Sequence, residues 1–148
     1  MSSSLELFEA VVRYETEAWT AVDAALRAAG APSLAAIEGL RLIRARGASA
    51  RVQDLAVDLG ITPGAASKFV DRLEQQRLVR RTSHPTDRRS SLVELTEAGV
   101  EAAVDGSAAA ERILDRHLSA AVPAGQAGEL TALFITLRAA VRGSAAAS

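Results

Sequence analysis

The stretch HPTDRRSSLVELTEAG, residues 84–99, joins three patterns within one short segment. A proline turn with two arginines comes first, alternating polar and apolar residues follow, and a threonine then stands where it can cap a helix. LVRRTS (78–83) and SSLVEL (90–95) both have the composition of strands. They predict a hairpin joined by HPTDRR. Because six residues exceed a tight turn, the hairpin tip is expected to project.

Two short helices joined by a glycine are predicted immediately before this hairpin. VQDLAVDL (52–59) is amphipathic, Gly60 makes the turn, and Thr62 caps a second helix. Pro63 stands at the first position of that helix, where a missing N–H costs nothing. The expected outer face of the second helix consists of Gly64, Ser67, Lys68, Asp71 and Gln75. A helix-turn-helix followed by a hairpin predicts a winged helix.

Longer helices are predicted on both sides of this unit. Apolar residues recur at spacings of three, four and seven over residues 5–30, and Ser33 can cap a second helix after them. A further helix is expected from 97 to about 120. Pro123 is expected to start the last helix, and the tail 143–148 is expected to fray. The predicted fold is therefore mainly α with a small β-hairpin wing, an α+β winged helix-turn-helix.

The composition excludes several classes of protein. The chain has 148 residues, 49% of them apolar, which suits a single domain with a real core. The absence of cysteine excludes disulfides, thiolate catalysis and thiol-based redox sensing. No apolar run reaches the roughly 18 residues that would span a bilayer, and the N-terminus lacks a secretory pattern, so a cytoplasmic protein is expected.

Charge is distributed unevenly along the chain. Residues 41–92 contain eleven basic and five acidic residues, a net charge of +6. Residues 1–40 have a net charge of −4 and residues 93–148 a net charge of −3. A basic middle between acidic flanks predicts one surface for a polyanion.

Duplex DNA is the polyanion that fits this arrangement. A helix with small residues at its N-terminus can approach the major groove, where Ser67 and Lys68 can reach base edges or phosphates. Arg88 and Arg89 at the wing tip suit the narrow minor groove, and Asp87 can orient Arg89 through an ion pair. The predicted DNA-binding residues are Thr62, Pro63, Gly64, Ser67, Lys68, Arg72, Arg88 and Arg89, with Asp87 as wing support.

The wing segment resembles the signature of the MarR-type transcription regulators, an Asp-x-Arg followed by Leu-Thr-x-x-Gly. In this chain the matching residues are Asp87, Arg89, Leu95, Thr96 and Gly99. Residues 54–81 also follow the helix-turn-helix pattern of that family. One difference stands out: the family usually has glycine just after the second helix, and this chain has Arg77.

The resemblance implies a homodimer that binds a pseudo-palindromic operator, usually as a repressor released by a small ligand. It implies one domain over 1–148, with a DNA-binding lobe at about 48–96 and dimerisation helices at about 5–30 and 97–142. Family ligand sites lie where the dimer helices meet the DNA-binding lobe. Here such a pocket for a small aromatic or anionic ligand would be lined by Arg13, Tyr14, Trp19 and His117.

Plainer interpretations stay open for the side chains chosen above. Arg88 and Arg89 can be solvated charges, Asp87 a turn former, Trp19 part of an interface core and His117 a solvent-facing residue. Arg80 and Arg81 alternate in direction, so at most one of them is expected to face a phosphate.

Other functional classes have less support. The chain has no nucleophile–base pairing and no glycine-rich phosphate loop, so no enzymatic activity is expected. Its two histidines are far apart, and neither a metal site nor a cofactor is predicted. The alternatives are a winged-helix protein-interaction module and a small-molecule-binding dimer without DNA binding. The basic middle argues against the first, and Ser67, Lys68, Arg88 and Arg89 argue against the second.

Overall fold

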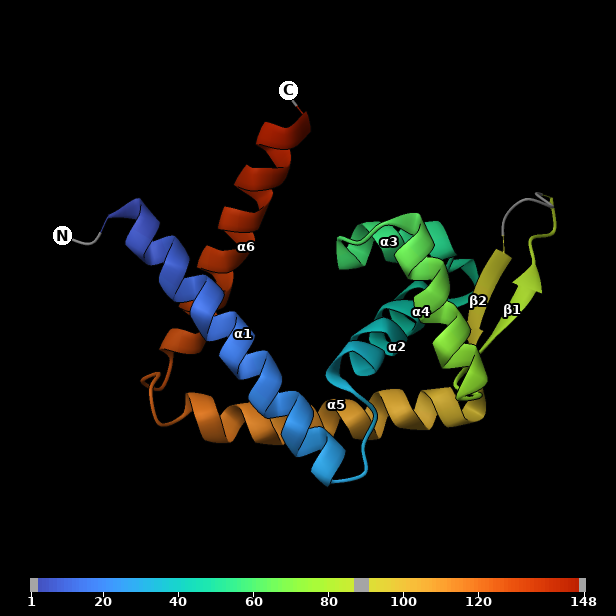
Figure 1. Cartoon of the computed structure of the whole chain (residues 1–148), viewed down its shortest axis with the longest axis horizontal. Helices are drawn as coiled ribbons and strands as arrows, with labels where there is room; N and C mark the ends of the chain where they lie inside the picture. The colour runs from blue at the N-terminus through green and yellow to red at the C-terminus, as the bar shows by residue number, and fades with distance from the viewer. Residues whose placement is uncertain (1–2, 87–90, 147–148) are drawn as a thin grey trace. The chain divides into compact units, whose positions relative to one another are not determined.

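The computed structural model describes residues 3–86 and 91–146 and contains the elements expected of a winged helix (Figure 1). In chain order these are α1 (Ser4–Ala28), α2 (Leu34–Arg46), the 3-10 turn η1 (Gly47–Ser49), α3 (Val52–Leu59), α4 (Pro63–Gln75), β1 (Val79–Ser83), β2 (Ser91–Leu95), α5 (Glu97–Leu118) and α6 (Gln126–Ala146). The predicted fold class is confirmed. The chain divides into two compact units, Met1–Glu111 and Arg112–Ser148; the predicted assignment of a DNA-binding lobe and dimerisation helices stays a prediction.

The helix starts follow the capping residues found in the sequence, with one exception. Ser33 accepts a hydrogen bond from the Ala36 amide at 3.2 Å, and α3 has the bounds that its amphipathic pattern predicted. The last helix was wrongly expected to start at Pro123. It begins at Gln126, because Gly125 has a left-handed φ of 90° that helical backbone cannot include. It also continues to Ala146, into the tail that was expected to fray.

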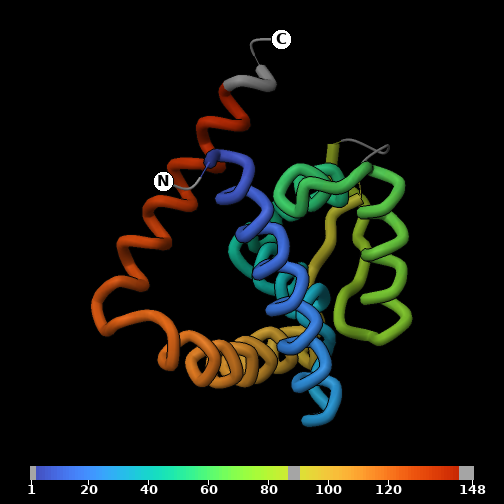
Figure 2. Tube along the Cα trace, turned by 60° about the vertical axis from the view of Figure 1, so that its left-hand side comes forward, coloured from blue at the N-terminus to red at the C-terminus, as the bar shows by residue number. Residues whose placement is uncertain are grey.

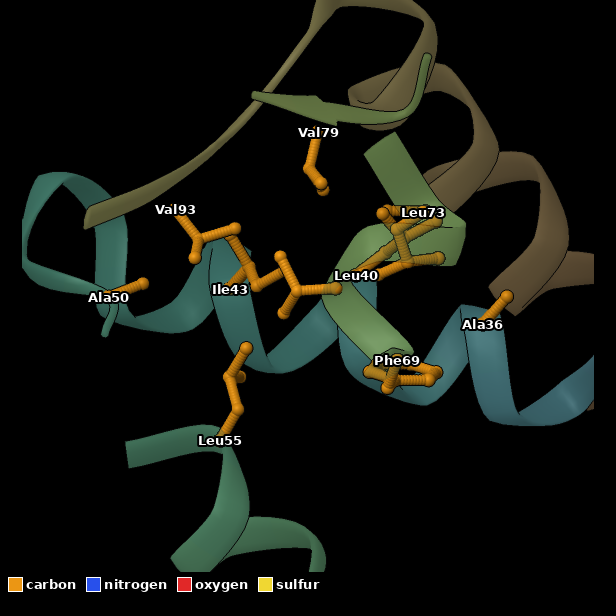
Figure 3. Close-up of a cluster of buried hydrophobic side chains, with 11 residues drawn as sticks. Ala36, Leu40, Ile43, Ala50, Leu55, Phe69, Leu73, Val79 and Val93 are labelled. Carbon is orange, nitrogen blue, oxygen red and sulfur yellow. The ribbon is translucent and has the colours of Figure 1, made fainter. Parts of the chain in front are cut away.

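The hydrophobic core of the first unit lies between α2, α3, α4 and the hairpin (Figure 3). Its fully buried large side chains include Leu40, Ile43, Leu55, Val70, Leu73, Val79 and Val93. Helices α2 and α4 approach closely because residue 39 is glycine: a β-carbon there would overlap the ring of Phe69. The face of α4 that packs on α2 is therefore the one opposite the predicted outer face.

The hairpin is anchored to the core by a pairing that the sequence did not reveal. Strands β1 and β2 are antiparallel, with Arg81 opposite Val93. The amide of Val93 also donates to the carbonyl of Ala50 at 2.8 Å, and Arg51 forms a β-bridge with Leu92. The chain just before α3 thus serves as a third, very short strand that fixes the root of the wing.

Helix α4 ends in a Schellman motif with an arginine at its left-handed position. The amide of Leu78 donates to the carbonyl of Leu73 at 3.0 Å, and the amide of Arg77 donates to the carbonyl of Glu74 at 2.9 Å. Arg77 has φ 59°, the only positive φ at a non-glycine residue among those described. An L-residue other than glycine, asparagine or aspartate adopts this conformation at a cost of about 1–2 kcal/mol. Arginine thus occupies a conformation that glycine normally supplies.

The Leu-Thr-x-x-Gly signature forms the junction between the hairpin and α5. The Thr96 hydroxyl donates to the Arg77 carbonyl at 2.7 Å and accepts from the Gly99 amide at 3.0 Å, which caps α5. The Thr96 amide donates to the Leu78 carbonyl at 3.0 Å. A β-carbon at Gly99 would overlap that same carbonyl oxygen. The backbone geometry of this junction therefore explains why Thr96 and Gly99 occupy these two positions.

Replacing Arg77 with glycine is expected to stabilise the protein. The substitution removes the left-handed strain at residue 77 but adds about 0.5–1 kcal/mol of unfolded-state entropy. The net gain in unfolding free energy should be about 0.5–1 kcal/mol, measured by urea denaturation at a fixed protein concentration. Arg77→Ala is the control: it removes the same side chain but keeps the β-carbon, and it should not gain stability. Equal unfolding free energies for Arg77→Gly and Arg77→Ala would rule out strain at this position.

Candidate nucleic-acid interface

The turn between α3 and α4 has the geometry of a helix-turn-helix. Gly60 ends α3 with a left-handed φ of 66°, and the amide of Ile61 donates to the Ala56 carbonyl at 3.0 Å. Thr62 then caps α4 by accepting a hydrogen bond from the Ala65 amide at 3.2 Å, and Pro63 occupies the first helical position. These local bonds set the direction in which α4 leaves the turn.

The direction of the turn is also held by an ion pair between α2 and α3. Arg46 donates two hydrogen bonds to the Asp58 carboxylate, at 2.8 and 3.0 Å, and its guanidinium lies 3.7 Å from Asp54. The hydrogen bond to Asp58 raises the pKa of Arg46 above its ordinary value. Arg46 counts toward the net charge of +6 on residues 41–92, but it is already paired with Asp58 and Asp54.

Helix α4 exposes the face that the sequence assigned to DNA. Thr62, Pro63, Gly64, Lys68 and Arg72 are exposed, and Ser67 is half-buried. No acidic residue lies in the first turn of the helix, so its N-terminal amide groups keep their positive potential. The structure brings these predicted contact residues together on one surface, and their contacts with DNA stay a prediction.

Two cations on this face have charge available for a ligand. Neither Lys68 nor Arg72 forms an ion pair with any residue that the structure describes. The Arg72 guanidinium lies 6.0 Å from the centre of the Phe69 ring, a cation–π distance that holds it along the helix. Charges of this kind can neutralise phosphates without first breaking an internal ion pair.

The two arginines of β1 are used differently. Arg80 donates two hydrogen bonds, at 3.1 and 2.9 Å, to one carboxylate oxygen of Glu94 on the paired strand. Arg81 points to the other face and contacts α4 through Asp71, Glu74 and Ser67. Both guanidinium groups are therefore paired within the protein, although the Arg80 side chain is still 67% exposed.

The wing has a root that the structure describes and a tip that it does not. The predicted tip contacts Arg88 and Arg89, and the supporting Asp87, lie outside the described residues. At the root, the Arg51 guanidinium lies 2.8 Å from Nε2 of His84. The sequence contains no sign of this pair, because no spacing rule relates the start of α3 to the end of β1.

The residues proposed for a ligand pocket lie in different parts of the chain. Arg13 and Tyr14 are exposed on α1, and Trp19 on the same helix is half-buried. His117 is exposed on α5 and belongs to the second compact unit. A pocket that includes all four stays a prediction.

The described residues contain no group of three or more histidine, aspartate or glutamate residues that could hold a metal ion. None of their helices is both long enough and apolar enough to cross a membrane.

Comparison with known proteins finds one family whose sequence profile matches part of the chain. The sequence profile of the MarR family matches residues 33–91, which run from the cap of α2 to the start of β2. No curated protein matches the chain by sequence.

Solved structures of MarR proteins share the fold over nearly the whole chain. AbsC, a MarR family transcriptional regulator from Streptomyces coelicolor, has a TM-score of 0.81 at 21% identity, covering 97% of this chain and 98% of AbsC. A MarR family regulator from Rhodococcus sp. RHA1 has a TM-score of 0.80 at 22% identity, with coverage of 93% and 96%. A variant of E. coli MarR solved with operator DNA has a TM-score of 0.77 at 22% identity, with coverage of 88% and 92%. Helices outside the matched profile therefore follow the MarR fold too.

Arg72→Ala is expected to weaken binding to duplex DNA of any sequence. If Arg72 neutralises one phosphate, the slope of log K against log salt concentration should flatten by about one unit. Fluorescence anisotropy of a labelled duplex at several salt concentrations measures this slope. Arg80→Ala is the matched control, because it also removes one guanidinium but one that is already paired with Glu94. An Arg72→Ala slope equal to that of the wild type would remove Arg72 from the interface.

Proposed function

We propose that this protein is a sequence-specific, double-stranded DNA-binding transcription regulator that acts as a homodimer. The observation that carries the proposal is the exposed face of α4, with Lys68 and Arg72 unpaired among the described residues, in a MarR-family winged helix. The E. coli MarR variant with the same fold was solved in complex with operator DNA. The net charge of +6 on residues 41–92 supports the same partner.

A second copy of the chain is the proposed partner of the terminal helices. On α1, Leu5, Phe8 and Val12 are exposed; on α6, Leu133, Phe134 and Leu137 are exposed. Apolar side chains of this size in such numbers mark an interface. A twofold dimer would present two α4 helices to two half-sites, so the operator is proposed to be pseudo-palindromic.

Ligand-controlled release is the proposed mode of regulation, with the protein acting as a cytoplasmic repressor. CouR from Rhodococcus jostii RHA1, which has a TM-score of 0.77 to this chain, was solved bound to p-coumaroyl-CoA. For this chain we propose a small aromatic or anionic ligand at Arg13, Tyr14, Trp19 and His117. Because the chain has no cysteine, thiol oxidation is not the signal. No catalytic step is part of the proposal.

DNA binding is tested with the full-length protein and a randomised duplex library. We expect enrichment of an inverted repeat, a dimer in sedimentation at micromolar concentration, and affinity that falls steeply with salt. Arg88→Ala and Arg89→Ala should weaken binding to all sequences alike. Binding that does not depend on salt, or a protein that captures no duplex, would favour the protein-interaction module or the dimer without DNA binding.

Trp19 offers a direct test of the ligand site, because it is the only tryptophan in the chain. Titration with phenolic and aromatic acids should change its fluorescence over the same concentration range that releases the selected duplex. Arg13→Ala should shift both responses to higher concentrations if Arg13 pairs with the anionic group of the ligand. A compound that releases DNA without changing Trp19 emission, and with equal potency on Arg13→Ala, would place the pocket elsewhere.

A further inference from the structure

Arg81 is the side chain through which strand β1 holds helix α4. Its guanidinium donates to the Asp71 carboxylate and, at 3.2 Å, to the main-chain carbonyl of Ser67. It also lies 3.5 Å from the Glu74 carboxylate, and the Arg81 amide donates to Glu74 at 3.3 Å. The strand and the helix lie side by side in both views (Figures 1 and 2). Only 27% of the Arg81 side chain is exposed, because most of it is covered by these contacts. Arg81 therefore links strand β1 to helix α4.

A further contact of Arg81 reaches a residue proposed to read DNA. Nη2 of Arg81 lies 3.4 Å from the hydroxyl oxygen of Ser67. A guanidinium group has only donors, so the serine oxygen must be the acceptor in this contact. The hydroxyl hydrogen of Ser67 must then point away from Arg81.

The usual partner of a helical hydroxyl is not used by Ser67. Elsewhere in this chain, side-chain hydroxyls donate to the carbonyl four residues earlier, as in Thr16, Thr20, Ser107, Thr131 and Thr136. Within the described part of the chain, the Ser67 hydroxyl forms no such bond. Its hydrogen is therefore available on the exposed side of α4.

We propose that Arg81 is a positioning residue for sequence recognition, because it makes Ser67 a hydrogen-bond donor toward the major groove. This inference rests on the proposed DNA-binding function. A hydroxyl hydrogen fixed in this way selects base edges that accept, namely purine N7, guanine O6 and thymine O4. Cytosine N4 and adenine N6 are donors, so opposite them the Ser67 hydrogen would have no acceptor. Because water is also excluded from the interface there, the unpaired hydrogen would cost binding free energy.

The neighbouring Arg80 provides a matched control. It has the same charge, lies one residue away and pairs with Glu94 on β2. Losing Arg80 leaves the Glu94 carboxylate unneutralised, and losing Arg81 leaves those of Asp71 and Glu74, so both variants should bind all sequences more weakly. Only the loss of Arg81 should change which base is preferred.

The experiment selects duplexes from a randomised library with four full-length proteins: wild type, Ser67→Ala, Arg81→Met and Arg80→Met. We expect Ser67→Ala and Arg81→Met to lose about threefold to tenfold discrimination at the same base pair of each half-site, the value of one hydrogen bond. Arg80→Met should keep the wild-type preference there. The double variant Ser67→Ala/Arg81→Met should lose no more at that base pair than either single variant, because both remove one interaction.

Several outcomes would overturn the inference. One is an Arg81→Met protein that keeps every base preference and loses affinity for all duplexes by a common factor. If circular dichroism shows that Arg81→Met is unfolded, Arg81→Lys replaces it. Lysine keeps an ion pair with Asp71 but cannot also bind Ser67 through a second arm, so an unchanged preference in Arg81→Lys would refute the role. A wild-type protein that enriches no sequence would instead refute the proposed function itself.

Discussion

The carbonyl group of Leu78 is the point on which the winged-helix architecture depends. It accepts the Thr96 amide and lies so close to α5 that residue 99 must be glycine. The amide of the same residue closes the Schellman motif on Leu73. One peptide segment thus fixes where α4 ends, where the hairpin begins and where α5 starts. Because these are backbone contacts, they set the angles between three elements with little dependence on side-chain packing.

Much of the fold could be predicted because its signals are local. Capping by Ser33 and Thr62, the glycine turn at Gly60 and the alternation in β1 act within a few residues, and they gave the correct elements. Features set by tertiary contact were missed. The pairing of Ala50 with Val93 has no sequence signature, and the start of the last helix depends on one left-handed residue, Gly125. The sequence shows Arg77 where the resembled family usually has glycine, but only the structure gives its left-handed φ of 59°.

The sequence predicted which face of α4 is exposed, but not which of the basic side chains are already paired within the protein. Periodicity alone was enough to put Lys68 on the outer face of α4, whereas Arg72 was predicted as a DNA contact outside that set. It could not separate arginines used inside the fold from those available to DNA, because that depends on which carboxylate lies nearby. Arg46, Arg80 and Arg81 all form ion pairs, so the basic middle overstates the charge available to phosphates. The ligand pocket rests on family resemblance and was beyond periodicity altogether.

The contacts of Arg81 also bear on the order in which the domain folds. They join residues only 7 to 14 positions apart, and Thr96 reaches Arg77 across 19. Closing loops of this length costs little chain entropy and takes well under a millisecond. The segment from α4 to the start of α5 therefore has the properties of one cooperative folding unit. Local opening would then release α4 and the hairpin together, so a state with only one of them in place would rarely be populated.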